Sequence, residues 1–335
     1  MNTEKIKLEP QLDTLRLLKI DDKDYFENYK NYISNSRLSL LNPEQDGNEE
    51  KFINNDSKIY SDSIILGSAV HELFLQGEYF EIAEEVNRPT AKTGFMADEL
   101  YGREINEETL IKASDKIEYY KGIFDKIKQK KFLNACENYF KARKKYESIK
   151  HDKTPIYINN ITKTKVKGCL KSLYENKEIM KLVNPEGLIK TPESLNENAI
   201  LIDIKGIFPN NESYIIHYKA KVDNFTIDKE TSKITVNDLK TTGGRIIDFK
   251  ENFNKFHYYR ELFSYCWLIN ILNDKIFNIV NPIYDSNCLV VSTIPLSNEY
   301  LSTVYKLTKN DFDNGKKEFV SLLKKAIYVM YEHRL

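Results

Sequence analysis

Apolar and polar residues alternate along two neighbouring runs in the second half of the chain. Tyr214 to Ile227 interleaves Ile, Tyr, Val and Phe with polar side chains, and a shorter run of the same kind extends from Ile234 to Leu239. The residues between the runs, Asp228 to Ser232, are typical of a turn. Because alternation with a period of two marks a half-buried strand, this stretch predicts an antiparallel β-hairpin.

Other segments with strand or helix periodicity surround this hairpin and define the fold class. Residues 1–20 carry no clear pattern, whereas 199–207, 276–284 and 288–295 indicate further strands. Apolar residues at helical spacing predict helices at 22–41 (two short ones broken near Asn35), from about Ser68 to Leu75, and at 106–149, 160–182, 249–272 and 310–333, the last capped by Asn310. We therefore expect an α/β or α+β fold, with a central mixed sheet of about four to six strands that contains an antiparallel hairpin and is flanked by helices. We expect one domain over residues 1–335, with a mostly helical part at 1–182, a sheet core at 183–300 and a C-terminal helix at 301–335.

Composition narrows the class of protein. The chain has 335 residues, of which 30% are charged, and a formal net charge of zero, so it lacks the overall basic charge of many nucleic-acid binders. Its four cysteines are far apart and form no Cys-x-x-Cys pair, which speaks against a zinc site, an iron–sulfur cluster or a disulfide framework. The sequence has no signal peptide and no apolar run long enough to span a membrane, so we expect no membrane association and a cytoplasmic protein.

The predicted hairpin would bring two carboxylates and an amine together. Asp223 and Asp238 would lie side by side at one end of the sheet, with Lys240 on the same face as Asp238. Two carboxylates so close either share a proton or hold a cation, and Mg²⁺ prefers such oxygen ligands. The alternative is a surface hairpin with solvated side chains, and the triplet Asp203-Ile204-Lys205 has the same spacing on another strand-like run.

Three further features carry candidate chemistry. His71 lies beside the apolar face of its predicted helix, where a packed or surface histidine is the alternative to a ligand. The segment from Arg88 to Gly94 is expected to be a loop, and its Arg88 and Lys92 would either contact phosphate or be ordinary loop cations. Glu261 and Tyr265 are spaced i,i+4 and so share one side of a helix.

The order of these features resembles the RecB-type branch of the PD-(D/E)xK nuclease superfamily, and in particular phage and prophage exonucleases of the exodeoxyribonuclease VIII kind. The similarity rests on six short segments that occur in the family's order over roughly residues 30 to 270: Ile33-Ser34-Asn35-Ser36-Arg37-Leu38, Gly67-Ser68-Ala69-Val70-His71, Arg88-Pro89-Thr90-Ala91-Lys92-Thr93-Gly94, Lys221-Val222-Asp223, Asp238-Leu239-Lys240-Thr241-Thr242 and Glu261-Leu262-Phe263-Ser264-Tyr265.

The resemblance implies a role for each matching residue. His71, Asp223 and Asp238 would bind a divalent metal together with the backbone carbonyl of Leu239, and Lys240 would position or activate the attacking water. Glu261 stands where the family usually has Gln, and with Tyr265 it would brace the site or touch DNA. The candidate contacts to DNA phosphate are Arg88, Lys92, Thr241 and Thr242.

The activity implied is that of a restriction-endonuclease-like core: a Mg²⁺-dependent deoxyribonuclease, with Mn²⁺ able to substitute, that degrades linear DNA ends for phage recombination. The implied partners are DNA, a single-strand annealing recombinase and further copies of the chain in a homo-oligomer, all in the cytoplasm of a bacterial host cell. Two alternatives stay open, namely a catalytically inactive DNA- or protein-binding protein on the nuclease fold and an endonuclease of the same superfamily.

Overall fold

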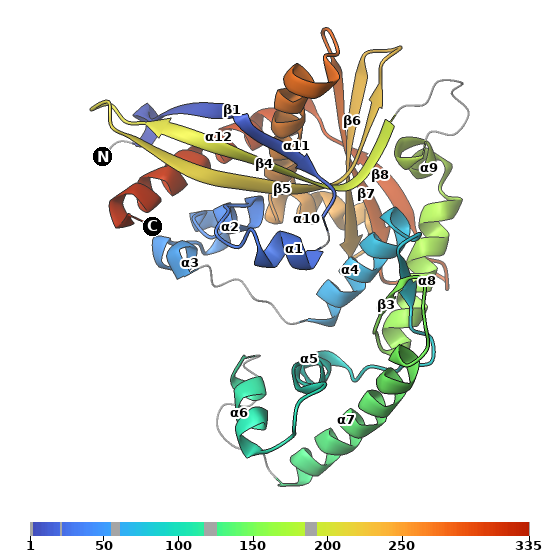
Figure 1. The fold of residues 1–335 in the computed structure, drawn as a ribbon. Coiled ribbons are helices and arrows are strands. Elements are labelled where there is room, and N and C mark those ends of the chain that lie inside the picture. The colour runs from blue at the N-terminus through green and yellow to red at the C-terminus, as the bar shows by residue number, and fades with distance from the viewer. Residues whose placement is uncertain (1–2, 21, 55–60, 117–125, 185–192, 335) are drawn as a thin grey trace. The chain divides into compact units, whose positions relative to one another are not determined.

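The computed structural model describes residues 3–20, 22–54, 61–116, 126–184 and 193–334 (Figure 1). The chain divides into two compact units, which are described one at a time. The first consists of Met1–Ser57, Leu173–Ser292 and Leu301–Leu335, and the second of Lys58–Ser172 and Thr293–Tyr300. The residues before position 58, expected in a helical part, belong to the unit that contains the large sheet.

The first unit is built on a six-stranded mixed sheet, as predicted (Figure 1). Its strands follow one another in the order β1 (Lys7–Leu18), β4 (Glu193–Ile207), β5 (Ser213–Asp228), β6 (Lys233–Thr242), β7 (Ile283–Ser292) and β8 (Ser302–Lys306). The β6–β7 pair is parallel and the other neighbours are antiparallel. The predicted hairpin is β5 and β6.

Helices of the first unit cover this sheet. They are α1 (Asp22–Glu27), α2 (Asn35–Ser39), α3 (Glu49–Asn54), α9 (Lys177–Val183), α10 (Phe249–Lys255), α11 (Tyr258–Leu272) and α12 (Lys309–His333). Helices α11 and α12 share a buried aromatic cluster with the sheet, in which the ring of Phe319 lies 5.6 Å from that of Tyr218 and 5.5 Å from that of Trp267. The expected pair of short helices at 22–41 is present as α1 and α2.

Three helix predictions were wrong in their boundaries. The expected helix 249–272 is interrupted at His257, which has a left-handed backbone (φ 55°) and separates α10 from α11. Helix α12 is capped by Thr308 and not by Asn310. The Thr308 hydroxyl accepts a hydrogen bond from the backbone N–H of Asp311, and the Asp311 carboxylate accepts one from the backbone N–H of Thr308. The expected helix 160–182 is likewise two, α8 (Asn160–Glu175) and α9, because the Asn176 side chain caps α9.

Two strand predictions also need correction. Residues 1–20 contain β1, whose pairing with β4 slips between Gln11 and Arg16, and this bulge changes the phase of the apolar alternation. The strands expected at 276–284 and 288–295 are one, β7, which begins only at Ile283 because residues 273–277 form a π-helical turn. The side chain of Asn273 holds the backbone N–H and carbonyl of Ile279 and fixes that turn.

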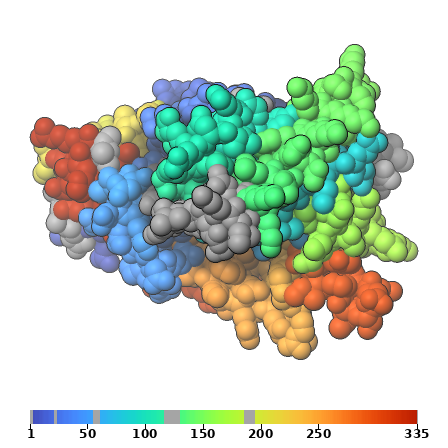
Figure 2. All heavy atoms as spheres, turned by 90° about the horizontal axis from the view of Figure 1, so that it is seen from below, coloured from blue at the N-terminus to red at the C-terminus, as the bar shows by residue number. Residues whose placement is uncertain are grey.

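The second unit is mostly helical. It contains α4 (Asp62–Leu75), α5 (Ala91–Leu100), α6 (Glu107–Lys116), α7 (Lys126–Glu147), most of α8, and the short parallel pair β2 (Phe80–Ile82) and β3 (Thr154–Ile156). Figure 2 shows α5, α6 and α7 of this unit in teal and green. Helix α4 starts at Asp62 and not near Ser68, because Ser61 caps its first turn. Across the residues described in both units, no helix is both long and apolar enough to cross a membrane.

Candidate functional site

A ladder of asparagines crosses the first unit's sheet beside the candidate carboxylates. Asn287 on β7 donates to Asn237 on β6 (2.9 Å), Asn237 donates to Asn224 on β5 (2.7 Å), and Asn224 donates to Asn196 on β4 (2.6 Å). Asn224 and Asn237 are fully buried and form the last paired rung of the β5–β6 hairpin. Because buried amides must be hydrogen-bonded, the ladder fixes the register at the point where these two strands part.

Asp223 and Asp238 are the first residues beyond that rung. Continued in register they stand opposite each other, but the strands have separated and their backbones no longer pair. The backbone N–H of Leu239 instead donates to Oδ2 of Asp223 over 2.7 Å. Since the N–H and C=O of one strand residue point toward the same neighbour, the Leu239 carbonyl also faces the opening between the strands.

Asp238 is the most deeply buried of the carboxylates at this opening. It is 0% exposed, and among the described residues its Oδ2 atom has no well-oriented hydrogen-bond donor, although Nζ of Lys240 lies 2.9 Å away. Burial, with the charges of Glu261 and Asp223, raises the pKa of Asp238 well above its ordinary value despite Lys240. Such an acceptor-rich, buried carboxylate favours a bound cation.

Lys240 lies between two carboxylates. Its Nζ is 3.0 Å from Oδ1 of Asp238 and 2.8 Å from Oε2 of Glu261 on α11. Although burial opposes the charged form, these two carboxylates hold the pKa of Lys240 well above its ordinary value. The ammonium is therefore a fixed positive charge and not a ready proton acceptor.

Glu261 is braced from its own helix. The Tyr265 hydroxyl donates to its Oε1 over 3.1 Å, as the i,i+4 spacing allows. Burial disfavours the charged carboxylate, but Lys240 and this hydroxyl lower the pKa of Glu261. Glu261 thus forms an ion pair with Lys240.

The structure adds a residue that the sequence did not single out. Glu197 on β4 lies in register opposite Asp223, since its neighbours Asn196 and Asn198 pair with Asn224 and Val222. The two carboxylates each have an oxygen within 4.8 Å of the other. Glu197 is buried, has a left-handed backbone (φ 53°) and forms an ion pair with Lys221 (2.8 Å). No motif marks the segment Asn196-Glu197-Asn198, so its role emerges only from strand pairing.

The donor set at this opening fits a hard divalent cation. Glu197 and Asp223 have oxygens within 4.8 Å of each other, Asp238 and Glu261 share Lys240, and the ammonium groups of Lys221 and Lys240 balance two of these four charges when all are ionised. Mg²⁺ and Mn²⁺ prefer such oxygen ligands. The excess of two negative charges and the unsatisfied Oδ2 of Asp238 are both consistent with such an ion.

The remaining candidates of the first unit follow on β6. Thr241 is half-buried, and Thr242 is buried with its hydroxyl accepting from the backbone N–H of Gly244 and the side chain of Asn252, both at 3.2 Å. These contacts close the loop that follows β6. The Thr242 hydroxyl therefore stabilises the end of β6 and the loop that follows it.

His71, Arg88 and Lys92 belong to the second unit. His71 is half-buried on α4. Arg88 is almost completely buried: its Nε donates to Asp98 over 2.8 Å, and its guanidinium lies over the ring of Phe95. The expected loop ends early, because α5 begins at Ala91, and Lys92 stands in the first turn of that helix.

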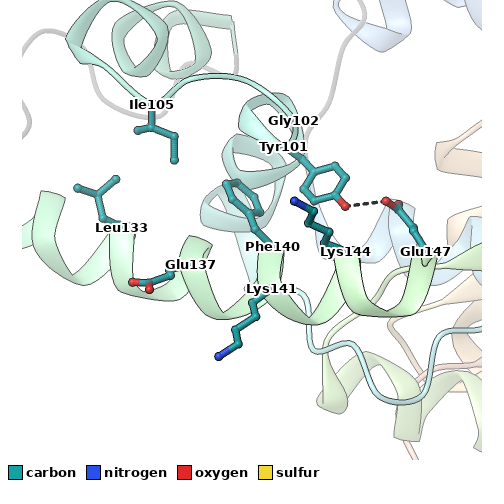
Figure 3. A pocket seen from close by; sticks show the side chains of 9 residues that line it. All are labelled: Tyr101, Gly102, Ile105, Leu133, Glu137, Phe140, Lys141, Lys144 and Glu147. Atoms are coloured by element: carbon teal, nitrogen blue, oxygen red, sulfur yellow. Dashed lines mark hydrogen bonds between the residues drawn. The ribbon is translucent and has the colours of Figure 1, made fainter. Parts of the chain in front are cut away.

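The second unit also has a hollow of about 860 Å³ beside α7 (Figure 3). Apolar side chains and two lysines line it: Tyr101, Ile105, Leu133, Phe140, Lys141 and Lys144, with Gly102, Glu137 and Glu147 completing the wall. At one end Tyr101 donates to Glu147 over 2.6 Å, and the guanidinium of Arg143 lies 4.0 Å from the Tyr101 ring centre and 4.4 Å from that of Tyr157. These contacts connect the C-terminal end of α7 to Tyr101 and Tyr157.

Comparisons with known proteins add little to this geometry. No protein-family model and no curated protein matches the sequence. Among solved structures, the chain is similar to one from Eubacterium rectale named "Putative exonuclease", with 11% identity and a TM-score of 0.46 over 94% of this chain and 88% of the other. At this level of similarity, the function has to be argued from the site itself.

Proposed function

We propose that the chain is a divalent-metal-dependent deoxyribonuclease that hydrolyses DNA phosphodiester bonds at the opening between β5 and β6. The observation that carries this proposal is the set of carboxylates gathered where the two strands part, with Lys240 held between Asp238 and Glu261. Carboxylates and an ammonium in one cleft are the groups that metal-assisted phosphodiester hydrolysis needs.

Asp223, Asp238 and Glu197 would hold the cation, with the Leu239 carbonyl and His71 as further ligands implied by the resemblance. When bound, Mg²⁺ supplies a polarised phosphoryl oxygen and a more acidic water. Lys240 stays protonated under the influence of its two carboxylates, so its part is to orient that water and to offset negative charge on the phosphate. Glu261 and Tyr265 fix the direction of the Lys240 side chain.

The finer proposal is an exonuclease of phage or prophage origin that acts on linear ends in the bacterial cytoplasm, with a single-strand annealing recombinase as partner and with oligomers of its own chain. It is supported by the family resemblance of six segments, including Asp238-Leu239-Lys240. The competing hypothesis of a catalytically inactive binding protein is disfavoured by the near-complete carboxylate and lysine set.

The test is digestion of linear duplex DNA labelled at each end in turn, with Mg²⁺, with Mn²⁺ and with EDTA. We expect degradation with either metal and none with EDTA, and the order of label release gives polarity. A covalently closed circle should stay intact if the protein is an exonuclease, whereas linearisation would establish an endonuclease. Absence of cleavage on linear, nicked and single-stranded DNA would contradict the proposal and support a binding role.

A further inference from the structure

A group of aromatic rings lies at the surface of the first unit, with Phe26 and His217 exposed and Tyr29 and Tyr32 half-buried. Phe26 on α1 is 62% exposed, and Tyr29 and Tyr32 follow it in the connection to α2. The ring of Tyr32 lies 5.1 Å from that of His217 on β5, which is also exposed, and 5.2 Å from that of Tyr29. We call Phe26, Tyr29, Tyr32 and His217 the aromatic patch.

His217 of the aromatic patch lies on β5, the strand that also carries Asp223. Side chains at alternate positions of a strand share a face, and the even positions Ile216, Tyr218 and Ala220 belong to the hydrophobic core. The odd positions His217 and Lys219 therefore point to the other side, whereas beyond Asp223 the odd positions Phe225 and Ile227 belong to the core. At about 3.3 Å per residue, the six steps from His217 to Asp223 span roughly 20 Å, a distance that a few nucleotides of a single strand can cover.

Positive charge lies within and beneath this patch. Arg16 on β1 is exposed and donates through Nη2 to the Tyr32 hydroxyl over 3.0 Å. Lys219 is buried two residues along β5 from His217, where its Nζ donates to the carbonyl of Tyr25 (2.7 Å) and lies over the rings of Tyr25 (4.1 Å) and Phe26 (5.5 Å).

Arg37 lies near Lys219 and adds to the positive charge beneath the aromatic patch. Burial and the neighbouring charge of Arg37 lower the pKa of Lys219 to about 8. Arg37 itself donates to the backbone carbonyls of Asn31 and Phe52, and its Nε has no hydrogen-bond partner among the described residues. Among the residues that the structure describes, these two cations are thus held by carbonyls and rings and not by carboxylates. His217, by contrast, is paired with Asp203 (2.7 Å), so within the described ranges the charge without a carboxylate partner comes from Arg16, Lys219 and Arg37.

We propose that the aromatic patch binds a single-stranded stretch of DNA, with bases stacked on Phe26 and on the Tyr32–His217 pair and with phosphates beside Arg16. Aromatic faces combined with cations are the means by which proteins hold single strands without reading sequence. In a duplex the base faces are already stacked on one another and cannot use such a surface. The inference rests on the proposed nuclease function and makes it more specific: the DNA that leads to or from the cleavage site would be single-stranded.

The test is the affinity of the full chain for a fluorescein-labelled oligothymidylate of about 20 nucleotides, measured by anisotropy in EDTA so that binding is observed without cleavage. Phe26→Ala and Tyr32→Ala should each raise the Kd at least about fivefold, the lower bound for the loss of one stacked base. Tyr32→Phe keeps the ring and should stay within about twofold of wild type. Affinity for a duplex of the same length should change little.

Tyr174→Ala is the matched control, because Tyr174 is 50% exposed on the same unit and lies outside the patch. It should bind like wild type. The proposal is overturned if Phe26→Ala and Tyr32→Ala bind as tightly as wild type, or if wild type does not bind the single strand. A wild type that binds but cleaves no DNA with Mg²⁺ would refute the nuclease proposal and leave the stacking surface supported.

Discussion

Asp238→Asn is expected to make the metal-free protein more stable while it abolishes cleavage. Asparagine has nearly the same shape as aspartate but removes a charge that burial and two neighbouring carboxylates disfavour. Burying a polar group without full compensation costs about 1–3 kcal/mol, and more for a charged group, so the charged form of Asp238 carries a larger cost than a neutral amide. Lys240 keeps Glu261 as its ion-pair partner in the variant.

The expected gain is therefore about 1 kcal/mol, which for a unit of roughly 200 residues raises the melting temperature by about 2–4 °C. The assay is thermal unfolding followed by circular dichroism in EDTA. Adding Mg²⁺ at about a hundred times its Kd should stabilise the wild type by about 2.7 kcal/mol and have little effect on the variant. The order of the two melting temperatures should thus invert when the metal is added.

The pH dependence of stability gives a second check on the expected direction of the change in Asp238→Asn. Because the pKa of Asp238 is raised in the folded protein, the unfolded chain loses this proton first as the pH rises above the ordinary value of 3.8. Stability of the metal-free wild type should then fall with rising pH until the folded-state pKa is passed, and Asp238→Asn should lack this component. A variant that melts below the wild type in EDTA at neutral pH would refute the reasoning.

Three other substitutions test the surroundings of the site. Glu261→Gln should keep cleavage within about tenfold of wild type, because Asp238 remains as counter-ion to Lys240; a loss as complete as that of Lys240→Ala would contradict the positioning role. Glu318→Ala leaves the buried Arg260 without its carboxylate partner and should cost about 3–5 kcal/mol in urea unfolding; a loss below about 1 kcal/mol would show that the pair contributes little. Gly315→Ala would place a methyl group 2.3 Å from a carbonyl oxygen of α11 and should lower stability by about 1–3 kcal/mol in a thermal melt, so an unchanged melting temperature would show that the two helices can separate at no cost.

The central hairpin could be predicted because the sequence pattern that determines it lies within the hairpin itself. Alternation over β5 and β6, with a polar turn between them, fixes both the strands and the face that Asp238 and Lys240 share. Their burial and their contacts with Glu261 depend on α11, whose spacing of Glu261 and Tyr265 was readable as well.

Other parts depended on non-local structure. Glu197 joins the site only through the pairing of β4 with β5, and its left-handed backbone breaks the pattern that would mark it. β1 was missed because its bulge shifts the alternation, and the break before α11 was missed because His257 is a non-glycine residue in a left-handed conformation that its contacts with Glu318 and Tyr259 maintain. Single-sequence patterns do not report such tertiary contacts.

The most direct test compares two lysines that occupy the same position of the same short sequence motif. Lys240 and Lys205 both end an Asp-x-Lys triplet on a strand of the same sheet, but only Lys240 lies at the opening between β5 and β6. Rates of degradation of a linear duplex with Mg²⁺ should be measured for wild type, Lys240→Ala and Lys205→Ala, each shown to be folded. We expect loss of cleavage in Lys240→Ala and wild-type cleavage in Lys205→Ala. Full activity in Lys240→Ala would contradict the proposed role of Lys240.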